Sequence, residues 1–267
     1  MDNYFGHVLG EQLQPNEIGY IFTHNRGAGY ISDFETQQQN PDGSQAFVQI
    51  GALYEHFAES ELDIDAWLQE AINFGYKRII IVGHSFGGPK VMNYFWKKQP
   101  LTVHGIILAS PADMVGLVMA PNSKTDYEYL LQEATQLVSM NQPRTLLSKR
   151  VWECYQVSAQ TFLDIFAENG PGDVFPILKN PTTFLALASI NQPILCLMGE
   201  NDDIIIRGLE KDLELIRQKA TNCLSFTSEI IPGADHCYRG KETQFAEIIL
   251  QWIKHTIMTP NNLPAPV

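Results

Sequence analysis

Cysteine, positive charge and long apolar runs are all scarce in this chain. The four cysteines show neither C-x-x-C spacing nor a compact framework, which argues against a disulfide-stapled fold and favours reduced thiols. Lys and Arg number 18 against 30 Asp and Glu, giving a net charge of −12. Nucleic acid and anionic membranes would be repelled by this charge, so a small neutral or cationic partner suits the chain better.

Membrane and export signals are also lacking. No stretch approaches the ~18 apolar residues of a transmembrane helix, and Met1-Asp2-Asn3-Tyr4 has no basic segment leading into an apolar one. We therefore expect a cytoplasmic protein without membrane insertion. No internal repeat is present, and 267 residues at 45% hydrophobic content can bury one large core.

Short apolar runs alternate with longer helical patterns, which is typical of a parallel sheet wrapped by helices. The predicted fold class is therefore α/β. Strands are expected over 19–24, 78–83, 104–110, 193–199 and 224–231, and helices over 62–74, 208–219 and 242–255. Another helix is expected to end near Gln99, because Pro100 cannot continue it.

The segment 111–191 has a different pattern, with no convincing strand. Helical patterns cover 127–138, 144–157 and 158–168. We interpret 111–191 as a helical lid inserted between two strands of a core formed by 1–110 and 192–258. Residues 259–267, with three prolines and two asparagines, are interpreted as a loose tail.

The most informative motif is Gly83-His84-Ser85-Phe86-Gly87, which directly follows the apolar run 79–82. A G-x-S-x-G motif between a strand and a helix is typical of a nucleophile elbow, where small neighbours let a strained turn lift the serine hydroxyl above the sheet. The motif predicts Ser85 as a nucleophile and the protein as a serine hydrolase. The alternative is an ordinary glycine turn between a strand and a helix.

A nucleophilic serine needs a histidine base and an acid that orients it. Asp202 follows the apolar run 194–198, at the strand end where open α/β sheets gather their ligands, and His236 follows the last predicted strand. We predict Asp202 as the acid and His236 as the base. Asp113 is the alternative acid; a turn role for Asp202 and a plain surface-loop position for His236 also stay open.

These motifs resemble the α/β-hydrolase superfamily, specifically its lidded serine esterase and lipase-like branch. The resemblance covers the chain from about residue 5 and rests on N-R-G-A-G at 25–29, G-H-S-F-G-G at 83–88, G-E-N-D at 199–202 and P-G-A-D-H at 232–236. It implies cleavage of a carboxylic ester or thioester of a small or medium-sized molecule through an acyl-enzyme. It also implies no cofactor, no metal, and an oxyanion contact from the backbone N–H of Phe86. The order serine, aspartate, histidine is the one this family uses.

The resemblance also implies that something is missing before residue 19. In the family, two or three strands precede the one predicted at 19–24, and the loop after the third supplies a second oxyanion donor. Residues 5–13 look like the helix that follows that loop, so we expect an N-terminally truncated hydrolase. Loss of one donor can cost about 10² to 10³ in turnover. The alternative function is therefore a truncated or degenerate hydrolase-fold protein that catalyses weakly and acts as a binding module. The physiological substrate and the oligomeric state stay open.

Overall fold

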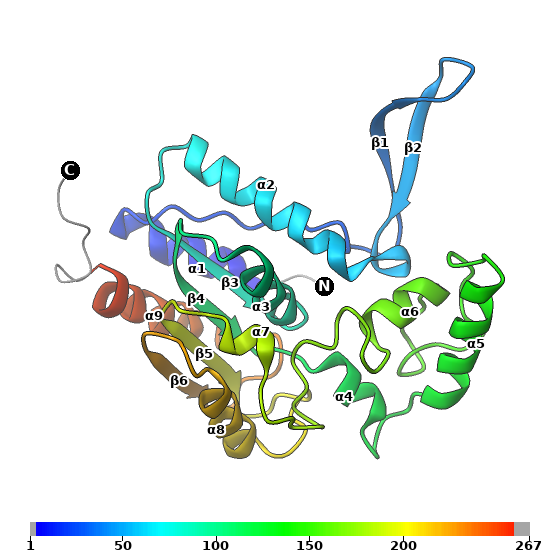
Figure 1. Cartoon of the computed structure of the whole chain (residues 1–267). Coiled ribbons are helices and arrows are strands. Elements are labelled where there is room, and N and C mark those ends of the chain that lie inside the picture. The colour runs from blue at the N-terminus through cyan, green and yellow to red at the C-terminus, as the bar shows by residue number, and fades with distance from the viewer. Residues whose placement is uncertain (1–3, 259–267) are drawn as a thin grey trace.

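A four-stranded parallel sheet forms the centre of the molecule (Figure 1), in a computed structural model that describes residues 4–258. Its order is β3-β4-β5-β6, formed by Ile79–His84, Val103–Ala109, Ile194–Gly199 and Phe226–Ile231. All three neighbouring pairs are parallel. The predicted α/β class, a parallel sheet flanked by helices, is confirmed.

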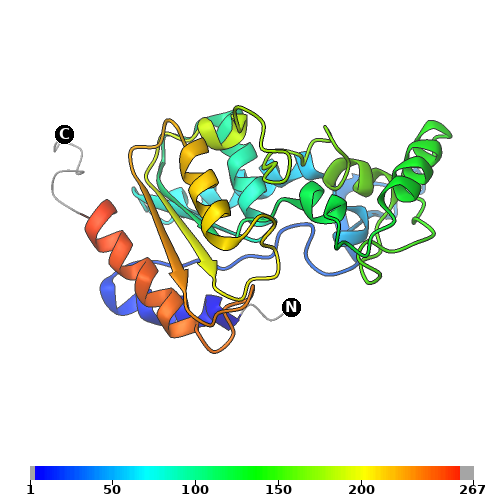
Figure 2. The same cartoon turned by 90° about the horizontal axis from the view of Figure 1, so that it is seen from below.

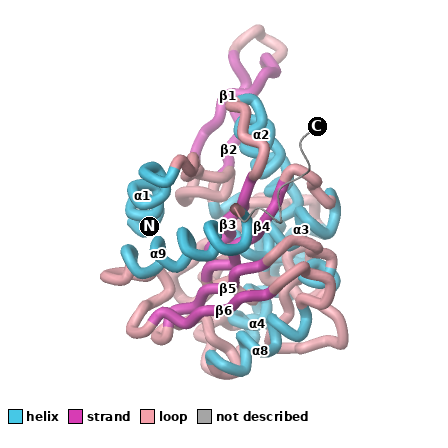
Figure 3. Tube along the Cα trace, turned by 90° about the vertical axis from the view of Figure 1, so that its left-hand side faces the viewer, coloured by secondary structure: helices cyan, strands magenta, loops and turns pink. Residues whose placement is uncertain are grey.

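Helices cover both faces of the sheet (Figure 3). Ile106 and Leu108 of β4 enter one core and Ile107 and Ala109 enter the other, because successive side chains of a strand point to opposite faces. The first core is closed by α2 (Ser60–Asn73), α3 (Gly87–Lys98), α7 (Leu185–Ala188) and α8 (Leu209–Lys219). The second is closed by α1 (Tyr4–Leu13), α9 (Glu242–Trp252) and the π-helical turn η4 (Ile253–Ile257).

The predicted strand over 19–24 is wrong. That segment forms no strand, and within the described chain β3 has a strand neighbour on only one side, β4. The aromatic rings of the segment pack instead on α1, where a Cβ on Gly6 or Gly10 would come within 2.9 Å of the Phe22 or Tyr20 ring. An apolar run becomes a parallel strand only where a neighbouring strand accepts its backbone hydrogen bonds. The run at 19–24 packs against a helix instead.

A β-hairpin that the sequence patterns did not predict projects from the body of the molecule (Figure 1). It pairs β1 (Ser32–Gln39) with β2 (Gln45–Ile50) in antiparallel fashion. Asp42 accepts hydrogen bonds from Ser44, and Gly43 takes the left-handed φ of 83° that the turn needs. The 3-10 turn η1 (Gln14–Asn16) precedes the hairpin in the chain, and η2 (Ala52–Tyr54) and η3 (Phe57–Glu59) follow it. The short helix α4 (Met114–Met119) follows β4.

The chain between β4 and β5 carries α4, α5 (Tyr127–Ser139), α6 (Ala159–Ile165) and α7, of which α4, α5 and α6 lie to one side of the sheet (Figures 1 and 2). The predicted helix over 144–157 is wrong. Isolated antiparallel bridges join Leu146 to Ser158 and Val151 to Tyr155 there. Trp152 and Glu153 have φ values of 51° and 60°, a left-handed conformation that cannot continue a right-handed helix.

The predicted tail at 259–267 lies outside the described residues. Within residues 4–258, no helix combines the length and the apolar character needed to cross a bilayer.

Candidate active site

Ser85 lies at a tight turn between β3 and α3. Its φ is 54°, a left-handed value that is strained for a residue other than glycine. The turn is held by two backbone hydrogen bonds: Ser85 N–H donates to Ala109 O at 2.9 Å, and Gly88 N–H donates to Ser85 O at 3.0 Å. A Cβ at position 83 would lie 2.6 Å from Gly87 O, so glycine is required there. The structure thus has the strand, turn and helix in the order that a nucleophile elbow needs.

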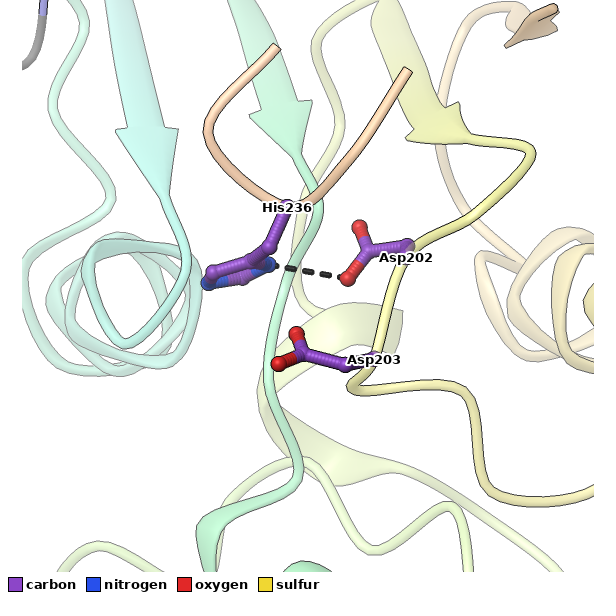
Figure 4. A group of neighbouring side chains, drawn as sticks. All are labelled: Asp202, Asp203 and His236. Atoms are coloured by element: carbon purple, nitrogen blue, oxygen red, sulfur yellow. Dashed lines mark hydrogen bonds and ion pairs between the residues drawn. The ribbon is translucent and has the colours of Figure 1, made fainter. Parts of the chain in front are cut away.

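The structure brings Ser85, His236 and Asp202 together from three loops at the carboxyl edge of the sheet. His236 Nε2 lies 2.8 Å from Ser85 Oγ. On the other side of the ring, His236 Nδ1 lies 2.9 Å from Asp202 Oδ1 (Figure 4). A carboxylate can only accept, so Nδ1 carries the proton and Nε2 is free to accept the serine hydroxyl. This is the arrangement in which histidine can act as a base toward serine.

Asp202 is placed to remain ionised. Its side chain is fully buried, and burial raises its pKa, but the hydrogen bond to His236 and further donors lower it by more, so the pKa lies below its ordinary value. Ile204 N–H donates to the same Oδ1 at 3.2 Å. A buried carboxylate of this kind can hold the imidazole in one tautomer at neutral pH.

His84, to which the sequence patterns gave no function, packs against the base. Its ring centroid lies 4.9 Å from that of His236, and its Nε2 lies 2.8 Å from His236 O. Burial lowers the pKa of His84 to about 4, so its ring is neutral at pH 7. His84 therefore donates an Nε2–H to the main chain of His236 and holds the loop that carries the base.

Asp113, the alternative acid, is engaged elsewhere. Its carboxylate accepts from Gly116 N–H at 2.7 Å and from Leu178 N–H at 2.9 Å. The first bond caps the start of α4. Burial raises the pKa of Asp113 to about 6. Asp113 thus links α4 to the segment around Leu178 through hydrogen bonds, whereas Asp202 is the carboxylate hydrogen-bonded to His236.

Asp203 lies beside the triad and completes a group that could ligate a cation. One ligand atom from each of Asp202, Asp203 and His236 lies within 4.8 Å of the other two (Figure 4). Oxygen and imidazole ligands suit several divalent ions. A cation on His236 Nδ1 would displace the proton that Nδ1 gives to Asp202, so cation binding and the triad arrangement exclude each other.

Phe86 directly precedes the first residue of α3, and its backbone N–H donates no hydrogen bond among the described residues, so it is available to an oxyanion. Within residues 4–258 we assign no second donor. The Phe86 ring packs against Phe57 at 5.6 Å and lies 4.6 Å below Lys90 Nζ. Lys90 forms a buried ion pair with Glu55, which sequence patterns could not reveal because the two lie 35 positions apart.

The fold and the site geometry define an α/β-hydrolase-like protein with a Ser-His-Asp arrangement. A family model matches residues 50–258, and the chain belongs to that family, which is described as "Protein of unknown function (DUF1749)". The resemblance to the α/β-hydrolase superfamily is thus confirmed for the fold, while the esterase and lipase-like branch stays a prediction.

Solved structures share this fold at low identity. Est1E from Butyrivibrio proteoclasticus with ferulic acid bound has a TM-score of 0.58 at 16% identity, covering 97% of this chain and 84% of that one. A bromoperoxidase from Bacillus anthracis has a TM-score of 0.52 at 14% identity, covering 95% and 88%. No curated protein matches the sequence. The likeness is therefore one of fold.

Proposed function

We propose that this protein is a serine hydrolase that cleaves a carboxylic ester or thioester of a small or medium-sized molecule through an acyl-enzyme. The observation that carries the proposal is the hydrogen-bonded chain from Ser85 Oγ through His236 to Asp202, with links of 2.8 and 2.9 Å. Three loops distant in sequence converge to make it. An arrangement with this polarity activates a serine hydroxyl, which is otherwise a weak nucleophile.

The reaction begins when Ser85 Oγ attacks the substrate carbonyl and His236 Nε2 takes the hydroxyl proton. Asp202 stabilises the resulting imidazolium through Nδ1–H, and Phe86 N–H donates to the oxyanion. His236 returns the proton to the leaving alcohol or thiol, which departs and leaves an acyl group on Ser85. Water, deprotonated by His236, then attacks the acyl-enzyme and releases the carboxylic acid.

The surroundings of Phe86 support an apolar acyl group. Its ring packs against an aromatic and aliphatic cluster that combines Phe57 of η3 with residues of the insertion, among them Phe162. We infer that 111–191 serves as a lid over the substrate. The net charge of −12 disfavours anionic substrates. Because Est1E is described with ferulic acid bound, a feruloyl ester belongs in the substrate panel beside p-nitrophenyl esters.

A fluorophosphonate probe tests the proposal without knowledge of the substrate. The purified chain should be labelled on Ser85, identified by peptide mass spectrometry, and should hydrolyse short p-nitrophenyl esters. Ser85→Ala and His236→Ala should abolish both signals. His104→Ala is the matched control and should keep both, because it removes a histidine whose ring nitrogen Nδ1 donates to Thr102 O at 2.9 Å, away from the triad.

The alternative of a binding module with weak catalysis rests on the single oxyanion donor assigned above. It predicts that the probe labels Ser85 slowly and that ester turnover of the wild type equals that of Ser85→Ala. Those two results together would replace the hydrolase proposal. Rapid labelling with turnover lost in both triad variants would reject the binding-module alternative.

A further inference from the structure

The β1–β2 hairpin projects from the rest of the chain and is poorly covered (Figure 1). Both strands are described in full, and none of their residues is buried. Phe34, Phe47 and Val48 are large apolar side chains that the hairpin leaves exposed. A two-stranded hairpin is at best marginally stable in water, and it becomes stable when further strands or a packed layer are added. The hairpin therefore stands to gain stability from a partner.

The two edges of the hairpin differ in charge and regularity. β1 carries Asp33 and Glu35, and it bulges between Glu35 and Gln39, which pair with residues only two positions apart on β2. Charges and bulges are features that keep an edge strand from pairing with another chain. β2, with the sequence QAFVQI, has neither a charged residue nor a proline. The outer edge of β2 is thus the one suited to accept another strand.

The peptide groups of β2 alternate between its two sides, as in any antiparallel strand. Ala46 O accepts from Thr36 Oγ1 of β1 at 3.2 Å, so the even-numbered residues of β2 direct their peptide groups toward β1. Gln49 O accepts from Arg144 of the insertion at 3.2 Å, so the odd-numbered residues direct theirs outward. Phe47 lies at the centre of this outer edge.

A second copy of β2 is complementary to this edge. When two β2 strands run antiparallel about a twofold axis at Phe47, the two Phe47 residues exchange both backbone hydrogen bonds. Gln45 of each copy then faces Gln49 of the other. Gln45 O already accepts from Asn40 Nδ2 at 3.2 Å. A carbonyl oxygen has two lone pairs, so Gln45 O and Gln49 O can each accept one further bond.

The same register joins like faces of the two hairpins. Phe34 and Val48 are direct cross-strand partners and share one face. With Phe47 on the axis, Val48 faces Ala46 of the second copy, so the apolar face continues across four strands. On the opposite face the two Phe47 rings lie next to each other, an arrangement that stabilises antiparallel strands. Both faces therefore gain apolar contacts.

The charges of the hairpin favour this pairing over the alternative through β1. Strands lie about 4.8 Å apart, so β1 and its copy would be about 14 Å apart across the two β2 strands. The screening length at physiological ionic strength is about 8 Å, so Asp33 and Glu35 of the two copies would repel only weakly. Pairing through β1 would place these carboxylates on adjacent strands. Antiparallel pairing also leaves the rest of each chain, with its net charge of −12 per copy, at opposite ends of the new sheet.

We propose that two copies of this chain associate by antiparallel pairing of their β2 strands, which forms a four-stranded sheet with Phe47 on the twofold axis. The contact involves neither Ser85 nor its partners in the triad, so it is independent of the proposed function.

Sedimentation velocity of the full chain across a wide range of protein concentration tests the association. The wild type should approach twice the mass of one chain as the concentration rises. Phe47→Lys places two like charges opposite each other on the axis, and Phe47→Pro removes the central N–H of the outer edge, so both variants should stay monomeric. Leu101→Lys is the matched control. It replaces an apolar side chain that is 93% exposed and lies outside the hairpin, and it should associate as the wild type does.

Amide hydrogen exchange locates the contact on the chain. In the associated wild type, the N–H groups of Phe47 and Gln49 should exchange about tenfold more slowly than in the dilute, monomeric protein, because pairing protects them. A wild type that stays monomeric at every concentration would overturn the proposal and leave the β2 edge to a strand of a different protein. Association that persists in both Phe47 variants, or exchange at Phe47 and Gln49 that does not slow, would overturn it as well. Neither readout uses ester turnover, so a failure of the proposed function would be seen separately.

Discussion

Replacing Asp202 by asparagine tests whether the buried carboxylate or the wider acidic cluster supports the histidine. Asp202→Asn keeps the shape of the side chain but removes its charge, 2.9 Å from His236 Nδ1. Two unit charges about 4 Å apart interact by about 4 kcal/mol at an effective dielectric constant of 20. This value suits the pair because the Asp202 side chain is fully buried and that of His236 is 20% exposed.

Loss of about 4 kcal/mol from the transition state corresponds to about a 10³-fold lower kcat/KM. The amide can also present N–H to Nδ1 and so favour the wrong tautomer, which extends the loss toward ~10⁴. The assay is initial-rate hydrolysis of p-nitrophenyl acetate at pH 7.5, with active-site titration by a fluorophosphonate to correct for folded protein.

Asp203→Asn is the matched control. Asp203 is exposed and lies in the same cluster, but it makes no hydrogen bond to His236 among the described residues (Figure 4). It should retain activity within about threefold of wild type, the size of a screened surface-charge effect. Retention of more than a tenth of the activity by Asp202→Asn would refute the electrostatic reasoning. An equal loss in both variants would indicate that the cluster acts as a unit, as a required cation site would.

Three further predictions concern the framework of the site. Gly83→Ala should destabilise the fold by about 1 to 3 kcal/mol or more, since its Cβ would lie 2.6 Å from Gly87 O. Gly87→Ala has open space around its Cβ and should leave the thermal midpoint unchanged. Equal thermal midpoints for the two variants would contradict this prediction. Lys90→Met should lower the free energy of unfolding, measured in urea, by about 3 to 5 kcal/mol, because it leaves the buried Glu55 charge without a partner. The double variant with Glu55→Leu should lose less. A double-variant loss equal to the sum of the two single losses would contradict this prediction. The pKa of Asp113 is raised from 3.8 to about 6 in the folded state. Between these two pH values the carboxyl is protonated in the folded protein and ionised in the unfolded chain. Its contribution to the free energy of unfolding therefore falls as pH rises from about 4 to about 6, by at most about 3 kcal/mol. Asp113→Asn should remove that slope from urea unfolding curves recorded across this range, and an unchanged slope would count against the assignment.

Parts of the fold could be predicted where local pattern and tertiary environment agree. The strands predicted at 78–83, 104–110 and 193–199 lie close to β3, β4 and β5. For β4 and β5 the reason is that a strand buried on both faces is apolar throughout. The predicted strand at 19–24 is wrong because its aromatic rings contact α1 while the segment stays largely exposed, and apolar alternation does not reveal whether a neighbouring strand is present. The hairpin was missed because β1, with the sequence SDFETQQQ, is mostly polar and exposed.

The helix predicted over 144–157 shows a further limit. Its apolar spacing fits one face of a helix, but Leu147, Val151 and Val157 are buried in a segment that is not helical and carries two isolated bridges. Trp152 and Glu153 adopt left-handed backbone conformations that neither residue favours by itself. Contacts within the insertion select this conformation, and these contacts cannot be predicted from the spacing of apolar residues.

The sequence by itself determined the candidate nucleophile, base and acid, because a G-x-S-x-G motif after an apolar run and polar residues after two later runs must meet at one edge of a parallel sheet. It could not determine which of the two glycines of the motif is sterically required, or that His84 holds the loop of His236. Those relations join residues up to 152 positions apart through packing distances of a few ångströms. Only the tertiary structure brings such atoms together, since hydrogen bonds and steric contact depend on separation in space and not along the chain.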